Sequence, residues 1–357
     1  MEFRTRLLIT ALLVAVGTAA VPAAAQERAD KPARPGDARR RPGHRSWESL
    51  APAEREARRL LFRMVRADQR VSYTGREVVV VGGRTMEMQV RFDPARGMRR
   101  ESLNPAGELI VDDLRKSWMV SPSRRRVIEG ESMLLALLGR WRDLLRISGD
   151  TVRTERQGED TVAGRTAEIL SVAPAMGALG PSRRFWIDKE TGLRLRSEEK
   201  DPEGRIVSSA YFLSVSLAPS FGETDFTAPT VPQGFQVVKS RRRSFASFDD
   251  ASKAGFAAPE PGWLPPGYRR QSVDVGDNGR WVSAHWGNGL TVVTITVMRS
   301  DAGMPMPVRS LPDGAEPRQS DLPGGRKGLS WRRGDTAFLL IAPLPEDVQR
   351  RIADSVR

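Results

Sequence analysis

The sequence predicts an α+β fold, in which a curved antiparallel sheet covered on one side by helix is followed by a smaller α+β domain. Three observations lead to this prediction. Short strands separated by turn residues fill residues 73–217, helical periodicity is confined to a few segments, and a cluster of prolines interrupts the chain between Pro219 and Gly234. The chain has 357 residues, enough for two domains of moderate size.

The N-terminal residues have the pattern of a secretory signal peptide. Arg4 and Arg6 precede a short apolar run, and three consecutive alanines follow it. We therefore expect residues 1–25 to be a signal peptide and the mature protein to be exported to the periplasm. The apolar run is short for a membrane span, and retention of the segment as an anchor is the alternative. Residues 26–45 are polar, proline-rich and basic, which predicts a disordered leader.

The folded part is predicted to begin with an amphipathic helix, because apolar residues recur along one helical face of residues 53–64. A strand at residues 73–81 follows, and the next strand carries alternating apolar residues at Met86, Met88, Val90 and Phe92. Further strands are predicted at residues 98–103, 108–113, 116–121, 124–128, 151–156, 163–173, 183–188, 193–200 and 205–217. This succession of strands and turns predicts an antiparallel meander.

Two segments of this domain differ from a strand with one buried face. The strand at residues 205–217 places Phe212 and Val215 on opposite faces, so we expect both faces to meet apolar surroundings. Residues 131–147 combine good helix formers with six consecutive apolar residues, which predicts a helix buried nearly all round. Two interpretations of that helix stay open: a plug inside the concave sheet, or an ordinary core helix.

The prolines indicate a boundary between two domains. We expect a first domain at residues 46–232, a linker or basic edge at 233–262 and a small α+β domain at 263–357. The second domain has predicted strands at residues 281–285, 291–298, 329–332 and 336–342, an Asn288-Gly289 hairpin turn and a terminal helix that begins near Pro345.

Three stretches of sequence, in both predicted domains, are distinctive together. They are residues 185–212 (FWIDKETGLRLRSEEKDPEGRIVSSAYF), residues 264–268 (LPPGY) with 285–297 (HWGNGLTVVTITV), and residues 335–357 (DTAFLLIAPLPEDVQRRIADSVR). In this order the chain resembles the RseB/MucB family of periplasmic regulators of the sigma-E envelope-stress system. The resemblance implies a first domain with the half-barrel fold of outer-membrane lipoprotein carriers, with helices in its concave side. It also implies a protein that binds the periplasmic segment of an anti-sigma factor, shields it from proteolysis, and releases it when acylated envelope components bind.

The residue types present leave little room for catalysis. Cysteine is absent, and the two histidines are His44, in the leader, and His285, in a predicted strand, where we expect a structural role. We find no nucleophile-elbow, zinc-protease or phosphate-loop motif, and therefore expect no enzyme activity, no cofactor and no metal. Glycoside hydrolysis needs two carboxyl groups that face the same glycosidic bond. The two acids at residues 112–113, and likewise those at 198–199, cannot do so, because neighbours on a strand point to opposite faces. A carboxylate-dependent envelope hydrolase is the least favoured alternative.

The charge of the chain favours acidic partners. Its formal net charge is +13, from 57 basic and 44 acidic residues. Nucleic acid is not expected, because export separates the protein from it and no motif interleaves aromatic with basic residues. Arg241, Arg242 and Arg243 lie at the predicted junction of the domains, where we expect them to bind the carboxylate-rich segment of an anti-sigma factor. A solvated run of linker charges is the alternative.

A bent sheet also offers an apolar surface on which acyl chains gain about 0.8 kcal/mol per buried methylene group. The candidates for an acyl-ligand cavity are Met86, Met88, Val90, Phe92, Trp118, Trp186, Leu195 and Phe212. The alternative is that these side chains form core against the helices. The predicted function is therefore regulation of sigma-factor signalling by a protein that senses an acylated ligand and is peripheral to the membrane at most. A carrier of lipids or lipoproteins across the periplasm is the alternative.

Overall fold

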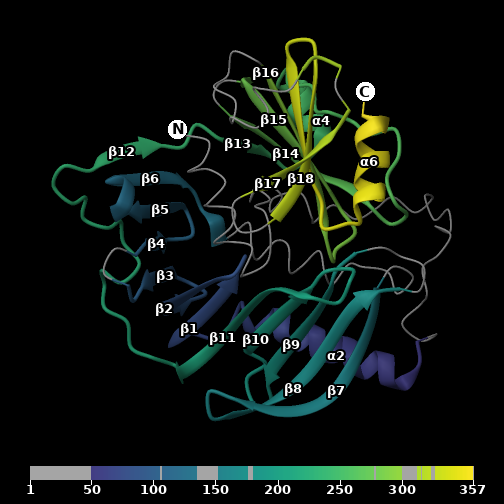
Figure 1. Cartoon of the computed structure of the whole chain (residues 1–357). Helices are drawn as coiled ribbons and strands as arrows, with labels where there is room; N and C mark the ends of the chain where they lie inside the picture. The colour runs from purple at the N-terminus through teal and green to yellow at the C-terminus, as the bar shows by residue number, and fades with distance from the viewer. Residues whose placement is uncertain are drawn as a thin grey trace, which may run out of the picture.

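The computed structural model describes residues 50–104, 107–134, 152–175, 180–276, 279–299, 312–314, 316–322 and 326–356. These residues form an open, curved sheet of twelve strands and a second sheet of seven strands, with few helices (Figure 1). The predicted α+β class with a large antiparallel sheet is confirmed. Within the ranges given above, no helix is long and apolar enough to cross a membrane.

Among the described residues the first helix is α2 (Pro52–Ala67), and it is amphipathic as predicted. Proline stands at its first turn, and the apolar stripe buries Ala57, Leu60, Leu61 and Met64. These side chains pack with Leu170, Val172, Phe185 and Ile187, so α2 lies against one face of the first sheet (Figure 1). Burial of this stripe holds the helix to the sheet.

The first sheet contains every strand predicted between residues 73 and 217. In chain order its strands are β1 (Tyr73–Val81), β2 (Arg84–Asp93), β3 (Gly97–Ser102), β4 (Leu109–Asp112), β5 (Lys116–Ser121), β6 (Arg126–Glu131), β7 (Val152–Val162), β8 (Arg165–Pro174), β9 (Ser182–Asp188), β10 (Arg194–Lys200), β11 (Ile206–Leu217) and β12 (Gln236–Lys239). A short 3-10 helix, η3 (Pro122–Arg124), precedes β6. The strand order is β12-β6-β5-β4-β3-β2-β1-β11-β10-β9-β8-β7. The helix predicted at residues 131–147 lies mostly outside the described residues; Met133 and Leu134 are helical.

Strand register defines two faces of this sheet. One cross-strand row joins Phe185, Ser197, Ala210, Val79 and Met86, so α2, which packs on Phe185, lies on the face that also carries Met86. We call it the inner face. By alternation and register it also carries Tyr73, Glu77, Met88, Val90, Phe92, Met98, Arg100, Ile110, Asp112 and Met119. The opposite, outer face carries Gln89, Glu101, Leu109, Trp118 and Val120.

Strand β11 departs from the regular alternation on which its prediction rested. The pairing with β1 shifts by one residue between Phe212 and Ser214, so Leu213 is a β-bulge and is 47% exposed. Beyond the bulge, Val215 packs in the same cluster as Phe212 instead of on the other face. Ile206 and Val207 are 56% and 43% exposed, so the expectation of apolar surroundings on both faces is wrong for this end of the strand.

The residues between the two predicted domains are ordered into strands and a helix. Residues 233–262, expected to be a linker or basic edge, contribute β12 to the edge of the first sheet, in parallel with β6, and β13 (Arg243–Phe245) to the edge of the second. They also form α4 (Phe248–Lys253), whose N-cap Ser247 accepts a hydrogen bond from the Asp250 amide. The connection therefore caps one edge of each sheet.

The second sheet has the order β13-β14-β15-β16-β19-β18-β17. Its other elements are β14 (Arg269–Gly276), β15 (Trp281–Gly287), β16 (Val292–Arg299), β17 (Arg318–Leu322), β18 (Arg326–Arg333), β19 (Thr336–Ile341) and the terminal helix α6 (Glu346–Ser355). Helices α4 and α6 bury Phe248, Val348 and Ile352 in one apolar cluster with side chains of the sheet. The predicted hairpin and terminal helix are both present.

One side chain of the second unit belongs to the core of the first. Leu290, in the β15–β16 turn, is 2% exposed and packs in the cluster formed by α2 and the first sheet. Beside it, the Thr291 methyl group lies 3.2 Å from where a Cβ at Gly180 would be. The two units therefore share buried apolar surface, although each has a core of its own.

Candidate functional site

Three of the predicted cavity residues lie in a row on strand β2. Met88, Val90 and Phe92 are 2%, 2% and 4% exposed on the inner face. The Phe92 ring stacks on Tyr73 at 5.2 Å between centroids, and Tyr73 in turn meets Phe212 edge-on at 5.5 Å. Met86, at the start of the row, is only partly buried and packs near Val79. The apolar run predicted from alternation therefore exists as a buried row on the inner face.

A second group of predicted residues is buried together next to this row. Trp186, Leu195 and Phe212 share one cluster, to which Tyr73 also packs. The Trp186 indole donates Nε1–H to Asp160 at 3.0 Å, and the Arg196 guanidinium lies 4.4 Å from its ring centroid. Trp186 is thus held by polar contacts as well as by packing. Its neighbour Phe185 faces α2, and Trp186 itself stands opposite Arg196 and Ile169, so register places Trp186 on the outer face, contrary to the prediction.

Trp118 is not part of either group. Its neighbour Met119 lies in the cross-strand row of Val90, Arg100 and Ile110, so Trp118 points to the outer face. There it packs with Val111, Val120, Val127 and Phe235. The prediction grouped Trp118 with the cavity residues. In β5 the residues Ser117–Ser121 are all apolar or small, so no alternation indicated which side chains face inward.

An ion pair, which sequence reasoning missed, lies among the apolar side chains of the inner face. Arg100 Nη2 donates to Glu77 Oε2, and the two residues are 4% and 9% exposed. Arg100 stands opposite both Val90 and Ile110, while Glu77 stands opposite Met88. Alternation from Met98 was the available signal, since it places Arg100 on the same face. The inner surface therefore combines apolar side chains with one buried polar pair.

The charged pair acts on a neighbouring phenol. Burial, followed by the negative charges of Glu77 and Asp68, raises the pKa of Tyr73 well above its ordinary range. The positive charges of Arg194 and Arg100 oppose that shift. Tyr73 therefore keeps its proton and presents a neutral hydroxyl beside the aromatic contacts on the inner face.

A second buried acid, Asp112, anchors the segment that follows β6. Its carboxylate accepts hydrogen bonds from the amides of Met133 and Leu134, at 2.7 and 3.0 Å, and from the Ser132 hydroxyl at 2.7 Å. Burial raises the pKa of Asp112, and these hydrogen bonds oppose the increase. Its neighbour Asp113 accepts amides of the next turn, so this acid pair serves local structure.

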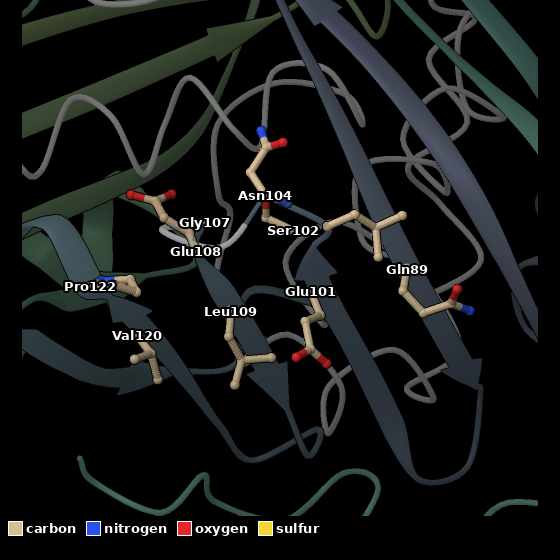
Figure 2. Close-up of a pocket in the computed structure, with 10 residues that line it drawn as sticks. Gln89, Glu101, Ser102, Asn104, Gly107, Glu108, Leu109, Val120 and Pro122 are labelled. Atoms are coloured by element: carbon tan, nitrogen blue, oxygen red, sulfur yellow. The ribbon is translucent and has the colours of Figure 1, made fainter.

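A pocket of about 480 Å³ opens on the outer face, away from the predicted cavity residues. Figure 2 shows Glu101, Leu109 and Val120 among the side chains that line it. Glu108, also in its wall, has its pKa raised by burial, while Arg124 and Ser121 oppose the shift. The wall of this pocket combines two acidic side chains with neutral polar and apolar ones, and this combination forms no recognisable motif in the sequence.

The three arginines at the junction do not act as one group. Arg241 is exposed; Arg242 pairs with Asp274; and the Arg243 guanidinium lies 5.2 Å from the ring centroid of Phe245. Glu131, from the first sheet, is close enough for Arg242 and Asp274 to act on its pKa, which burial raises. Arg242 therefore contributes to the connection between the sheets, and Arg241 and Arg243 remain the accessible members.

His285 is 5% exposed and has two polar contacts. Its Nε2 lies 2.9 Å from Asp274 Oδ2, and its Nδ1 lies 3.0 Å from the Thr294 hydroxyl. Burial would raise the pKa of Asp274, but Arg242, His285 and Ser244 together hold it well below its ordinary range. Among the residues with described placement, no cluster of three or more potential metal ligands occurs.

Comparison with known proteins places the first sheet in a known family. Residues 56–231 match the model of the MucB/RseB N-terminal domain. Over 205 residues, the chain is 25% identical to the sigma-E factor regulatory protein RseB of Haemophilus influenzae. That match covers 56% of this chain and 58% of the relative, so the chain spans less than two thirds of the relative's length.

Two solved structures have the same fold over both units. One is the complex structure of Pseudomonas aeruginosa MucA/MucB, with a TM-score of 0.57, 18% identity, and coverage of 85% of this chain and 98% of that one. The other is MucB in complex with MucA(peri), with a TM-score of 0.58, 18% identity, and coverage of 84% and 98%. The likeness extends beyond the residues of the family model, into the second sheet.

Proposed function

Because this chain belongs to the RseB/MucB family, we propose that it is a periplasmic regulator of envelope-stress signalling that binds the periplasmic segment of an anti-sigma factor. The observation that carries the proposal is the match of residues 56–231 to the family's N-terminal domain. Two relatives support the proposed role. RseB is a sigma-E factor regulatory protein, and MucB forms a complex with MucA.

The second part of the proposal is that an acylated ligand binds at the inner face and controls release of the partner. Met88, Val90 and Phe92 supply a continuous apolar row, and methionine adapts to chains of different shape. Each methylene group that such a surface removes from water contributes about 0.8 kcal/mol. We leave Trp118 and Trp186 out of the proposed cavity, because register places both on the outer face.

Accessible basic side chains near the junction support recognition of an acidic partner. Arg241 is exposed and Arg243 is partly held by aromatic rings. Charges of this kind mainly accelerate association, whereas apolar contacts decide how slowly a complex dissociates. Binding rather than catalysis is the proposed activity, since the acid pair at Glu198 and Glu199 is engaged by Arg196 and Arg183.

The experiment measures binding of two components to purified residues 26–357. The first is the periplasmic segment of a single-span anti-sigma factor encoded beside this protein, and the second is a soluble acylated glycolipid. We expect calorimetry to detect a complex with the segment, and the glycolipid to weaken it. Glycolipid binding without any affinity for the segment would instead support the carrier of lipids or lipoproteins. No binding of either component would refute both.

A further inference from the structure

Glu77 and Arg100 form a buried ion pair among apolar side chains, and burial of the two charges is energetically unfavourable. Two charges removed from water lose hydration that their mutual attraction repays only partly, so buried pairs are often replaceable by apolar residues without loss of stability. Here the pair crosses strand β2, from β1 to β3, over the row that contains Met88 and Val90. Its position therefore coincides with the surface proposed to bind acyl chains.

One donor of this pair has no acceptor. The Nε–H of Arg100 is buried and makes no hydrogen bond, while Nη2 is used by Glu77. A buried donor without a partner costs free energy, and a guanidinium group presents its donors in a fixed planar fork. One of the two Nη2 hydrogens points in the same direction as Nε–H, so Arg100 can donate to Glu77 through Nη2 and to a second acceptor beside it through Nε–H.

We propose that Arg100 recognises the carbonyl oxygen of an ester-linked or amide-linked acyl chain on the inner face. This inference rests on the proposed function, and it specifies which chemical group of the ligand the protein recognises. A neutral carbonyl suits the site better than an anion does, because Glu77 already balances the charge of Arg100 and an added anion would leave a net buried negative charge.

The recognised feature is the acyl linkage rather than the headgroup. The Nε–H supplies one donor, and the neighbouring side chains Met88, Val90 and Ile110 supply apolar contacts for the chain beyond the carbonyl. Esters of glycolipids and amides of acylated proteins share this carbonyl. An alkyl ether of the same length lacks it, which makes the ether a matched probe.

The test compares two phosphatidylcholine analogues below their micelle concentrations: dioctanoyl phosphatidylcholine and the corresponding di-O-octyl ether. Calorimetry on the full chain is expected to give about fivefold tighter binding of the ester, the effect of one net hydrogen bond. In the variant Glu77→Leu with Arg100→Met, which replaces the whole pair by apolar side chains, the two lipids should bind equally. Glu77→Gln alone keeps the arginine donor and should keep the preference.

Each outcome separates this inference from the proposed function. Equal binding of ester and ether by the unaltered chain, or a preference that survives removal of Arg100, would overturn the inference while leaving acyl binding intact. Failure of the unaltered chain to bind either lipid would remove this inference together with the acyl-binding part of the proposed function, and would leave binding of the anti-sigma segment untouched. Thermal unfolding is recorded for each variant, and if the apolar pair does not fold, Glu77→Gln with Arg100→Met replaces it with the same expected loss of preference.

Discussion

Arg242 forms an ion pair with Asp274, a residue that is 3% exposed. The same carboxylate accepts a hydrogen bond from the Ser244 hydroxyl at 2.6 Å and lies 2.9 Å from His285. Arg242 and Ser244 come from the connection between the sheets, whereas Asp274 and His285 are on β14 and β15. The network therefore attaches the connection to the second sheet.

The first prediction concerns the stability of this network. Asp274→Asn removes the charge that balances Arg242 and weakens the hydrogen bonds to this buried carboxylate. The loss of charged hydrogen bonds costs about 2 kcal/mol, and Arg242, whose side chain is 35% exposed, can regain water. Denaturant unfolding of the full chain should therefore have a lower midpoint. Asp335→Asn is the control, because that side chain is 94% exposed and its loss is expected to change stability by at most about 0.5 kcal/mol. Equal denaturation midpoints for the two variants would show that Asp274 does not stabilise the fold through this network.

The second prediction concerns acid. The folded-state pKa of Asp274 is lower than its ordinary value of 3.8, so the carboxylate contributes stability that is fully present above that value. This contribution is lost as the pH falls below about 4, because the unfolded chain then binds the proton more readily. The stability difference between the unaltered chain and Asp274→Asn should thus narrow as the pH falls below 4. If the difference in stability between the two proteins stays constant below pH 4, the prediction is wrong.

How much of the fold was predictable depends on the length over which a pattern repeats. The alternation from Met86 to Phe92 and the stripe of α2 gave correct strands and a correct helix, because each repeats over several residues. Local irregularities were not predictable. The bulge at Leu213 shifts one strand by a single residue, which reverses the faces of Val215 and everything beyond it.

The site was predictable only in part, because side-chain partners come from distant segments. The row of Met88, Val90 and Phe92 follows from one strand alone. The orientation of Trp118 depends on its register with β4, and the role of Arg242 depends on Asp274, which is 32 residues away in sequence. A run of arginines in sequence does not reveal which of them is neutralised by a buried acid.

The third prediction separates the three arginines. Arg241→Glu with Arg243→Glu should slow association with the anti-sigma periplasmic segment and reduce the salt dependence of its rate, leaving acyl-ligand affinity unchanged. Stopped-flow measurements at low and high salt give both quantities. Arg242→Glu is expected to act differently, by lowering the melting temperature through repulsion of Asp274. Unchanged association rates in the double variant would make Arg241 and Arg243 solvated charges of the connection.

The fourth prediction tests the contact between the two units. Leu290→Ala should reduce the stability of the full chain by about 3 kcal/mol, because the leucine is 2% exposed inside the cluster of α2. Leu213→Ala is the matched control, since that side chain is 47% exposed and its loss leaves no cavity. Differential scanning calorimetry should show a lower transition for the first variant alone. If Leu290→Ala melts like the control, the turn does not support the first unit's core.

The last prediction compares the two faces of the first sheet. Met88→Asp introduces a charge into the inner apolar row, where it must be desolvated, and should weaken binding of an acylated ligand at least about tenfold. Trp118→Leu changes a comparably buried side chain on the outer face and should leave the affinity unaltered even if it lowers stability. Ligand titrations are run well below the melting temperature of each variant, so that loss of folded protein does not imitate loss of binding. Weakened binding in Trp118→Leu, together with unchanged binding in Met88→Asp, would move the acyl site from the inner face to the outer face.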